Sequence, residues 1–307
     1  MTLEAVLIAG PTASGKSALA AALARRHGGV VINADSMQVY RDLAVITARP
    51  TADEIGEVPH LLYGHVDGAV NHSVAAYAAE VAALLPALRA QGRLPVLVGG
   101  TGLYFKALVE GLSDMPAVPE AVRTAFRVRT AGLETAALHA ELAARDPLMA
   151  EKLRPSDRLR VMRALEVLEA TGRSLALFQG ARRPGPLAGA RTLRFFLAPE
   201  RALVRARIDA RFEQMMAGGA LDEVAALKAR GLDPLLPVMR AHGVPGLIAH
   251  LDGALSLAEA VARGQADTRA YAKRQMTWFR HQMHDWQAVA PQEAEAIAFA
   301  ALDAEGA

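Results

Sequence analysis

The 307-residue sequence contains no cysteine, and only 5% of its residues are aromatic. Without cysteine, neither disulfide bonds nor thiolate metal sites can form. No apolar run approaches the roughly 18 residues that a membrane-spanning helix needs. The N-terminal residues also lack the basic segment of a signal peptide. These absences predict a soluble, cytoplasmic protein.

Hydrophobic residues make up 52% of the chain, with many Ala and Leu, which favours helices around a modest sheet. In the first hundred residues, short apolar runs alternate with helical patterns. The runs Ala5–Ala9, Val30–Asn33 and Leu94–Val98 are typical of strands, and Ser17–His27 and Val74–Ala90 of helices. This alternation predicts an α/β fold with a parallel sheet flanked by helices.

A second region differs from this pattern. Residues from Pro119 to about Gly180 are almost wholly helical in pattern, and Arg191–Leu197 then indicates a strand that returns to the first sheet. Residues 200–307 look mainly helical. We therefore predict an α/β core from residues 1–112 and 191–307, with C-terminal helices, and a mainly helical insertion domain at 113–190.

Charge is unevenly distributed along the chain. Residues 122–211 hold 18 Lys and Arg against 9 Asp and Glu, a net charge of +9. The rest of the chain holds 16 basic and 23 acidic residues, a net charge of −7. A basic segment in an otherwise acidic chain suggests a polyanionic partner, although a solvated Arg-rich helix face gives the same pattern.

The clearest motif lies between the first strand and the first helix, and it fits the phosphate-loop (P-loop) pattern G-x-x-x-x-G-K-[ST]. Glycines let backbone N–H groups point inward at phosphate oxygens, and the following helix offers its positive N-terminal end. The lysine adds a mobile charge, and the final hydroxyl suits Mg²⁺. The residues are Gly10, Pro11, Thr12, Ala13, Ser14, Gly15, Lys16 and Ser17.

Most such loops bind nucleoside triphosphates, in proteins that usually carry an Asp at the end of a later strand for Mg²⁺. Here the best candidate strand ends in Gly99-Gly100-Thr101, without an acid. This counts against an ATPase or kinase but leaves both open. Asp35 instead follows the second strand, where ligands bind in doubly wound sheets, and it could act as a general base or cap the next turn.

Together these segments resemble one family, the tRNA dimethylallyltransferases, also called isopentenyl transferases. The resemblance extends from the P-loop to about Arg280, over most of the chain. Its markers are the Gly-Pro-Thr opening of the loop, Asp35-Ser36-Met37-Gln38-Val39-Tyr40, Val98-Gly99-Gly100-Thr101-Gly102-Leu103-Tyr104, Arg160 with Arg163-Ala164-Leu165-Glu166-Val167, and Lys273-Arg274-Gln275-Met276-Thr277-Trp278-Phe279-Arg280.

The resemblance implies transfer of a dimethylallyl group from dimethylallyl diphosphate to N6 of adenosine 37 in tRNA, releasing pyrophosphate. Asp35 matches the general base, and Thr101 a residue at the target nucleotide or the diphosphate. The P-loop would hold the diphosphate, with Lys16 and a Mg²⁺ on Ser17 stabilising the leaving group. Arg205, Arg207 and Arg211 match positions near the diphosphate.

The resemblance also implies that the helical domain of a monomer grips the anticodon stem-loop while the adenine is flipped into a channel. The positions that match tRNA contacts are Asp35, Ser36, Met37, Gln38, Thr101, Arg123, Leu159, Arg160, Val161, Met162, Arg163, Arg240, Ala241, His242, Gly243, Val244 and Pro245. The chain departs from the family pattern at Ile46, where glycine is usual, and at Val244, where a tyrosine is common.

Other patterns in the sequence indicate a function less clearly. His281 and His284 could face one metal, but surface positions explain them better, and His60 and His65 suggest nothing specific. Tyr271, Trp278 and Phe279 are expected to pack the last helix on the core. Three alternative functions stay open: a nucleotide or small-molecule kinase, a prenyltransferase acting on free adenine nucleotides, and a non-catalytic RNA-binding protein.

Overall fold

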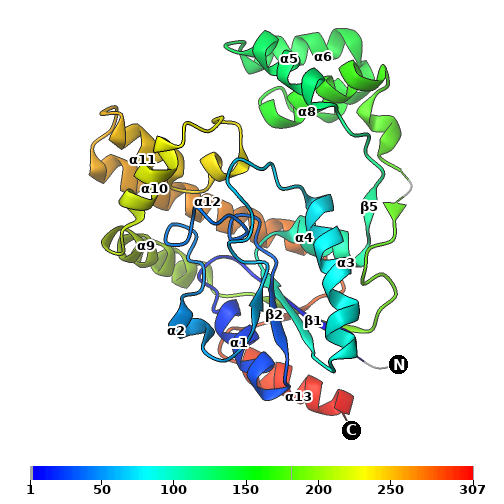
Figure 1. Ribbon diagram of the computed structural model, residues 1–307, viewed down its shortest axis with the longest axis vertical. Coiled ribbons are helices and arrows are strands. Elements are labelled where there is room, and N and C mark those ends of the chain that lie inside the picture. Colours follow the sequence, from blue (N-terminus) through cyan, green and yellow to red (C-terminus); the bar gives the residue numbers. More distant parts are fainter. Residues whose placement is uncertain (1–2, 181, 307) are drawn as a thin grey trace. The chain divides into compact units, whose positions relative to one another are not determined.

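A computed structural model describes residues 3–180 and 182–306. The chain forms two compact units. Unit 1 comprises Met1–Glu110 and Gly185–Ala307, and unit 2 comprises Gly111–Pro184. In Figure 1, unit 2 is the green part of the chain that carries the labels β5, α5, α6 and α8.

Unit 1 is built on a six-stranded sheet in which every neighbouring pair is parallel. The strand order is β3-β2-β4-β1-β7-β8. Parallel strands covered on both faces are near-continuous apolar runs, and β1 and β4 are buried throughout. The strands are β1 (Ala5–Ala9), β2 (Val30–Asn33), β3 (His60–Leu61), β4 (Pro95–Gly99), β7 (Thr192–Leu197) and β8 (Gln287–Val289).

Helices cover both faces of this sheet (Figure 1). On one face, α1 (Lys16–Arg26) and α13 (Ala294–Gly306) pack side by side through Leu23 and Ala298. On the other, α3 (Val74–Ala90) and α4 (Gly102–Val109) bury an aromatic cluster that includes Tyr77 and Phe105. The short helix α2 (Ala52–Ile55) lies in the connection between β2 and β3.

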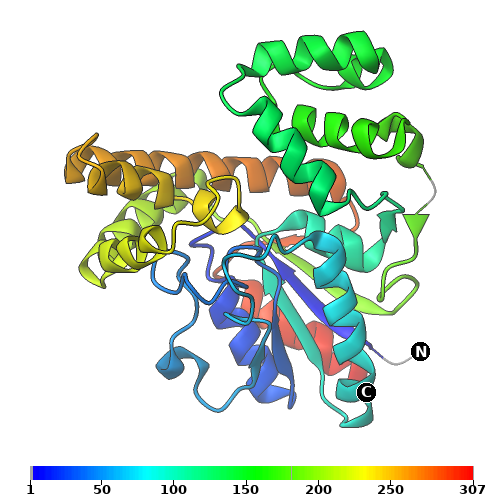
Figure 2. The same cartoon turned by 45° about the horizontal axis from the view of Figure 1, so that its top comes forward.

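A third apolar cluster lies beyond the sheet, among the C-terminal helices. It is formed by residues of the connections after β2 and β3, among them Tyr40 and Ile46, and by α9 (Arg201–Ala217), α10 (Ala220–Ala229), the 3₁₀ turn η2 (Pro237–Arg240), α11 (Val244–Leu251) and α12 (Leu257–Gln282). Helix α12 has 26 residues and begins with a capping box between Ser256 and Glu259. Figure 2 shows that its length carries it from this cluster to the sheet, where Phe279 joins the aromatic cluster.

Unit 2 is mainly helical. Its helices are α5 (Glu120–Thr130), α6 (Thr135–Arg145), α7 (Pro147–Lys152) and α8 (Arg158–Thr171), followed by the 3₁₀ turn η1 (Leu175–Phe178). Helix α8 begins at the cap Asp157 and ends at Gly172, whose φ of +66° suits glycine. Two short antiparallel strands, β5 (Leu112–Ser113) and β6 (Arg182–Arg183), pair where the chain enters and leaves the unit.

The α/β fold and the return of Arg191–Leu197 to the sheet are confirmed. Residues 200–307 are mainly helical, as predicted. The edge strand β8 was not predicted, because its three residues are too few to give a sequence pattern. The predicted strand at Leu94–Val98 is shifted by one residue. Residues 185–190, placed in the insertion from sequence, belong to unit 1, because Leu187 N–H bonds to Leu108 O in α4.

The interpretation of residues 122–211 as one basic segment is also corrected by the fold. Unit 2 carries 12 basic and 9 acidic residues, a net charge of only +3. Much of the excess lies at residues 191–211, on β7 and α9 of unit 1. The sequence window had joined two surfaces that the fold assigns to different units. Within residues 3–180 and 182–306, no helix has the length and apolarity needed to cross a membrane.

Candidate active site

The P-loop occupies the turn between β1 and α1. Gly15 adopts φ +90°, and Ala13 takes the unusual left-handed value of +61°. Gly10 admits no side chain, because a Cβ there would lie 2.9 Å from Ser14 Oγ and 3.2 Å from Leu197. The Ser14 hydroxyl is buried and has no hydrogen-bond partner among the described residues, as expected of a group that awaits a ligand oxygen.

Lys16 supplies the charge of the loop. Its Nζ donates to Pro11 O at 3.2 Å, which holds the half-buried ammonium beside the turn. Burial lowers the pKa of Lys16 to about 8, the Asp35 carboxylate opposes this change, and the positive charge of Arg211 adds to it. An anionic ligand would stabilise the charged form, so the site favours a negatively charged group.

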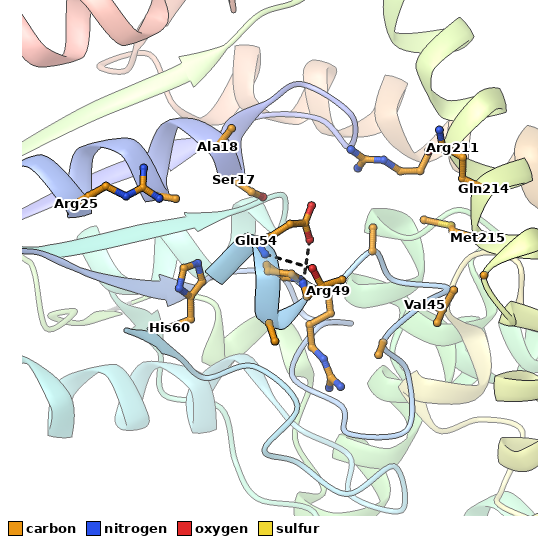
Figure 3. Close-up of a pocket in the computed structure, with 17 residues that line it drawn as sticks. Ser17, Ala18, Arg25, Val45, Arg49, Glu54, His60, Arg211, Gln214 and Met215 are labelled. Atoms are coloured by element: carbon orange, nitrogen blue, oxygen red, sulfur yellow. Dashed lines mark hydrogen bonds between the residues drawn. The ribbon is translucent and has the colours of Figure 1, made fainter. Parts of the chain in front are cut away.

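A wide cavity of about 900 Å³ opens beside this loop. Figure 3 shows Ser17 and Arg211 in the upper part of the view and Arg49 in the lower part, with the Glu54 carboxylate between them. Burial lowers the pKa of Arg211, although the Glu54 carboxylate raises it. The cavity is rich in cationic and hydroxyl groups, which suits a diphosphate.

The same cavity fits the predicted Mg²⁺. Magnesium prefers oxygen ligands and usually keeps several waters when it binds with phosphate groups. The exposed Ser17 hydroxyl and the Glu54 carboxylate both line the cavity, whereas β4 ends in Gly99-Gly100-Thr101 without an acid. Two hard-oxygen donors are therefore available in this cavity, from the P-loop and α2 rather than from β4, although Glu54 Oε2 also accepts from Thr51 N at 2.9 Å.

Asp35 is fixed at the carboxyl end of β2. Its backbone N–H donates to Asn33 Oδ1 at 2.8 Å, and its carboxylate Oδ1 accepts from Met37 N at 2.9 Å. The side chain of Asn33, fully buried, returns two hydrogen bonds to Asp35 O and Leu62 O. These bonds hold the half-buried carboxylate in one orientation.

Thr101 meets Asp35 from the neighbouring strand, β4. The Thr101 N–H donates to Ala34 O, and its Oγ1 accepts from Ser36 N at 2.9 Å. Gly99 is required here, because a Cβ at this position would come within 2.1 Å of the Ala34 backbone. The two strand ends therefore meet at backbone contact distance, and the predicted catalytic residues Asp35, Thr101 and Lys16 lie at one edge of the sheet.

Two further residues of this site come from α12. The buried Gln275 accepts from Thr12 N in the P-loop at 3.2 Å and donates to Gly100 O at 2.8 Å. Tyr271 forms side-chain hydrogen bonds with Thr101 and Gln275, and burial raises its pKa. Phe279 and Trp278 pack α12 on the core as predicted, and Tyr271 in addition lines the cavity beside Asp35. The sequence around Gln275 was one of the segments that resemble the family, but the resemblance assigned no role to this residue.

A second, much smaller cavity of about 70 Å³ adjoins Asp35. Its lining combines large apolar side chains, among them Met37, Ile46 and Phe212, with polar groups that include Thr12 and His242. Ile46, where the family pattern has glycine, is buried here without positive φ. It packs close to Gly243, whose own Cβ would meet Ile46 Cδ1 at 3.0 Å. Arg211 and Met215 line both cavities, so the two adjoin.

The predicted tRNA contacts fall in both units. In unit 1, His242 lines the small cavity and its ring lies 4.5 Å from that of Tyr271; burial lowers its pKa. Ala241 and Val244 are buried, and Arg240 and Pro245 flank this segment. The tyrosine usual at Val244 is thus replaced by a core residue.

In unit 2, Leu159 and Arg160 are exposed on α8, whereas Val161 and Met162 point into the core. Arg123 pairs with Glu120 at 2.7 Å, and Arg163 donates to Pro116 O. The side chains of Val161 and Met162 therefore support the helix rather than offering a surface to RNA.

The three arginines of α9 do not act together. Arg211 faces the wide cavity. Arg207 lines a separate hollow with Ser14 and Gly15, and Arg205 lies in a groove with Lys273 of α12. Arg211 and Arg207 thus line cavities that P-loop residues also line, whereas Arg205 does not.

The fold and site define a P-loop α/β protein, in which a cavity lined by Ser17 and three arginines adjoins a smaller one that contains a carboxylate. Comparison with known proteins identifies the group more closely. Residues 38–282 match the family model described as IPP transferase. The chain belongs to this family. Because the match begins at Gln38, it includes neither the P-loop nor Asp35.

Individual relatives agree with this assignment. The chain is 69% identical over 295 residues to the tRNA dimethylallyltransferase of Methylobacterium sp. (strain 4-46), covering 96% of each chain. It is 60% identical over 293 residues to that of Rhodopseudomonas palustris, covering 95% of this chain and 91% of the relative.

Solved structures are similar as well. The full-length tRNA isopentenylpyrophosphate transferase of Bacillus halodurans superposes with a TM-score of 0.70 at 32% identity, covering 99% of this chain and 98% of that one. A eukaryotic dimethylallyltransferase acting on tRNA gives 0.79 at 26% identity, covering 97% of this chain and 78% of the other.

Proposed function

We propose that the protein transfers a dimethylallyl group from dimethylallyl diphosphate to N6 of adenosine 37 in tRNA. Membership of the IPP transferase family makes it a transferase that prenylates tRNA. The observation that carries the finer proposal is the pair of adjoining cavities. One is lined by Ser17 of the P-loop and by Arg211, and the other by Asp35, by Thr12 of the P-loop and by large apolar side chains.

The donor fits these cavities in one direction. Its diphosphate lies against the P-loop N–H groups, Lys16 and Arg211, and its five-carbon chain lies among Met37, Ile46 and Phe212. Negative charge develops on the departing pyrophosphate in the transition state, so the two cations stabilise the transition state more than the bound donor. Mg²⁺ bound at Ser17, with Glu54 nearby, would supply further positive charge to the same oxygens.

Asp35 accepts the proton. In the reaction the C1–O bond to the diphosphate breaks, a bond forms between N6 and C1, and one N6 proton passes to the carboxylate. Oδ1 is already held by Met37 N, while Oδ2 faces the side of Gly100 and Thr101. Held in this way, the base needs little reorganisation when the adenine enters.

The acceptor must reach this site from outside the stacked anticodon loop. We propose that the target adenine is extruded and stacks beside the Tyr271 and His242 rings, because a base within the stack cannot present N6 to an electrophile. A hollow lined by Thr101, Tyr271, Arg274 and Trp278 offers aromatic and cationic groups for this purpose. The same proposal includes the anticodon stem-loop as the part of the tRNA that is bound. It also includes a monomeric enzyme and a cytoplasmic location.

The test is to incubate the protein with Mg²⁺, labelled dimethylallyl diphosphate and tRNA carrying an unmodified adenosine 37. We expect label on N6 of that adenosine and loss of transfer in Asp35→Ala. Label on free AMP in the absence of RNA would contradict the requirement for tRNA. ATP consumption without prenyl transfer would instead support a kinase and overturn the proposal.

A further inference from the structure

Three metal-binding side chains of unit 1 converge outside the proposed active site. They are His65 and His72, on the segment between β3 and α3, and Glu80, on the second turn of α3. Their ligand atoms all lie within 4.8 Å of one another. No other group of three His, Asp or Glu residues within residues 3–180 and 182–306 meets this condition.

The spacing of the three groups suits one metal ion. His65 Nε2 and His72 Nε2 each lie 3.2 Å from Glu80 Oε2. Zinc binds imidazole nitrogen and carboxylate oxygen at about 2.0–2.2 Å, which separates neighbouring tetrahedral ligands by roughly 3.3 Å. The two rings are nearly perpendicular, at 84°, so both can direct Nε2 toward the same carboxylate without stacking.

The segment that carries His72 is held firmly. The His72 side chain is only 5% exposed, and its Nδ1 lies 3.3 Å from the Tyr104 hydroxyl of α4. The His72 backbone N–H donates to the Tyr40 hydroxyl, which donates in turn to Val70 O. A histidine whose second nitrogen has a hydrogen-bond partner is the usual arrangement of metal ligands, because that partner fixes the ring.

We propose that His65, His72 and Glu80 bind one divalent transition-metal ion of the zinc class. The site is separate from the Mg²⁺ expected at Ser17, and the proposal does not depend on the transferase activity. Imidazole donors select zinc, cobalt or nickel, whereas magnesium prefers oxygen ligands. Three protein ligands leave a fourth position for water.

Metal binding would join the loop before α3 to the helix itself. In the metal-bound form, His72 Nδ1–H donates to the Tyr104 oxygen, and Nε2 is free to coordinate. Without metal, the same three side chains form hydrogen bonds between the imidazoles and the carboxylate. Since both forms are compatible with the folded chain, an ion that binds the folded form preferentially raises its thermal stability.

Titration of tag-free, metal-stripped full-length protein with Zn²⁺ tests the proposal, with Co²⁺ as a spectroscopic probe. We expect one Zn²⁺ per chain, a visible Co²⁺ absorption band and a higher melting temperature with Zn²⁺. Glu80→Gln and His65→Ala should each weaken Zn²⁺ binding about tenfold or more. Glu80→Gln retains the size of the side chain and its hydrogen bonds, and His65 is exposed, so neither should prevent folding.

A matched control uses two exposed histidines elsewhere on the chain. The double variant His281→Ala/His284→Ala should bind Zn²⁺ as the unaltered protein does, and excess Mg²⁺ should not displace the ion. Absence of stoichiometric Zn²⁺ binding would overturn the proposal and leave a hydrogen-bonded cluster. Equal loss of affinity in the control, or none in Glu80→Gln, would overturn it too, because the ion would then bind elsewhere.

Discussion

The two adjoining cavities of the site differ mainly in size and in the side chains they present. The cavity beside Ser17 measures about 900 Å³, and three arginines, two hydroxyls and a carboxylate line it together with several small apolar residues. The cavity beside Asp35 measures about 70 Å³, and larger apolar side chains line it together with threonines, a tyrosine and a histidine. Arg211 and Met215 line both, so a single ligand with a charged and an apolar end could occupy the two together.

Because of this difference, we expect one cavity to determine the affinity for the donor and the other to determine which donor is accepted. Electrostatic attraction to a diphosphate falls off gradually with distance, so the wide cavity needs charge more than shape. A small, packed cavity discriminates by volume, because one additional methylene meets fixed side chains. We therefore expect substitutions in the wide cavity to affect donor binding, and those in the small cavity to affect turnover and donor choice.

The largest effect is expected at the carboxylate of the small cavity. Asp35→Asn preserves the size of the side chain but removes the proton acceptor, so kcat should fall about 10²–10⁴-fold. The measurement is single-turnover transfer of labelled prenyl to tRNA, with donor affinity and melting temperature as controls. Near-normal turnover would show that another group accepts the N6 proton.

The next largest effect is expected at Gln275, whose hydrogen bonds connect the P-loop with the segment after β4. Gln275→Leu removes the bonds to Thr12 N and Gly100 O, and a shift of about 1 Å between donor and acceptor can cost about 10²-fold in kcat. The KM for each substrate should change little, which separates positioning from binding.

Gln265→Leu provides a matched control on the same helix, since Gln265 bonds to Asp209 O instead. It should leave kcat unchanged. If Gln275→Leu lowers the melting temperature and raises both KM values without affecting kcat, its role is structural only.

Adjacent residues allow a direct comparison of the two cavities. Ile46 lines the small cavity and Val45 the wide one. Ile46→Ala should improve the kcat/KM ratio of geranyl to dimethylallyl diphosphate by about tenfold, because the small cavity gains room. Val45→Ala should leave this ratio unchanged. An equal shift in both variants would mean that the small cavity does not determine donor length.

The smallest effect concerns the pH dependence that Lys16 of the P-loop gives to donor binding. Burial and Arg211 lower the pKa of Lys16 to about 8, against the opposing effect of Asp35. The ammonium is the form that binds a diphosphate, and it loses its proton as pH rises through 8. The kcat/KM for the donor should therefore fall above pH 8, by up to about tenfold per pH unit. In Lys16→Arg, whose guanidinium stays charged, this decline should disappear.

The sequence predicted those features that depend on a short segment of chain. The P-loop and the strand before it were located because glycine spacing and an apolar run specify local backbone. Asp35 was predicted from its place after a strand, since the carboxyl ends of parallel strands form a common edge. Helix α3 was predicted at Val74–Ala90, where the structure has it.

Features that join distant segments depended on the tertiary structure. Gln275 bonds to Thr12 across 263 residues, and the Glu223 carboxylate of α10 accepts the backbone N–H groups of Ala44, Val45 and Ile46. Likewise, His65 suggested nothing from sequence until the fold brought His72 and Glu80 beside it.

The sequence by itself thus determined the phosphate loop, the order of the core elements and the family resemblance, because these follow from local pattern and spacing. Only the tertiary structure decided which side chains share a cavity, how small the space beside Asp35 is, and how the basic charge is divided between the units. Those properties depend on packing between segments far apart in the chain, which no local pattern encodes.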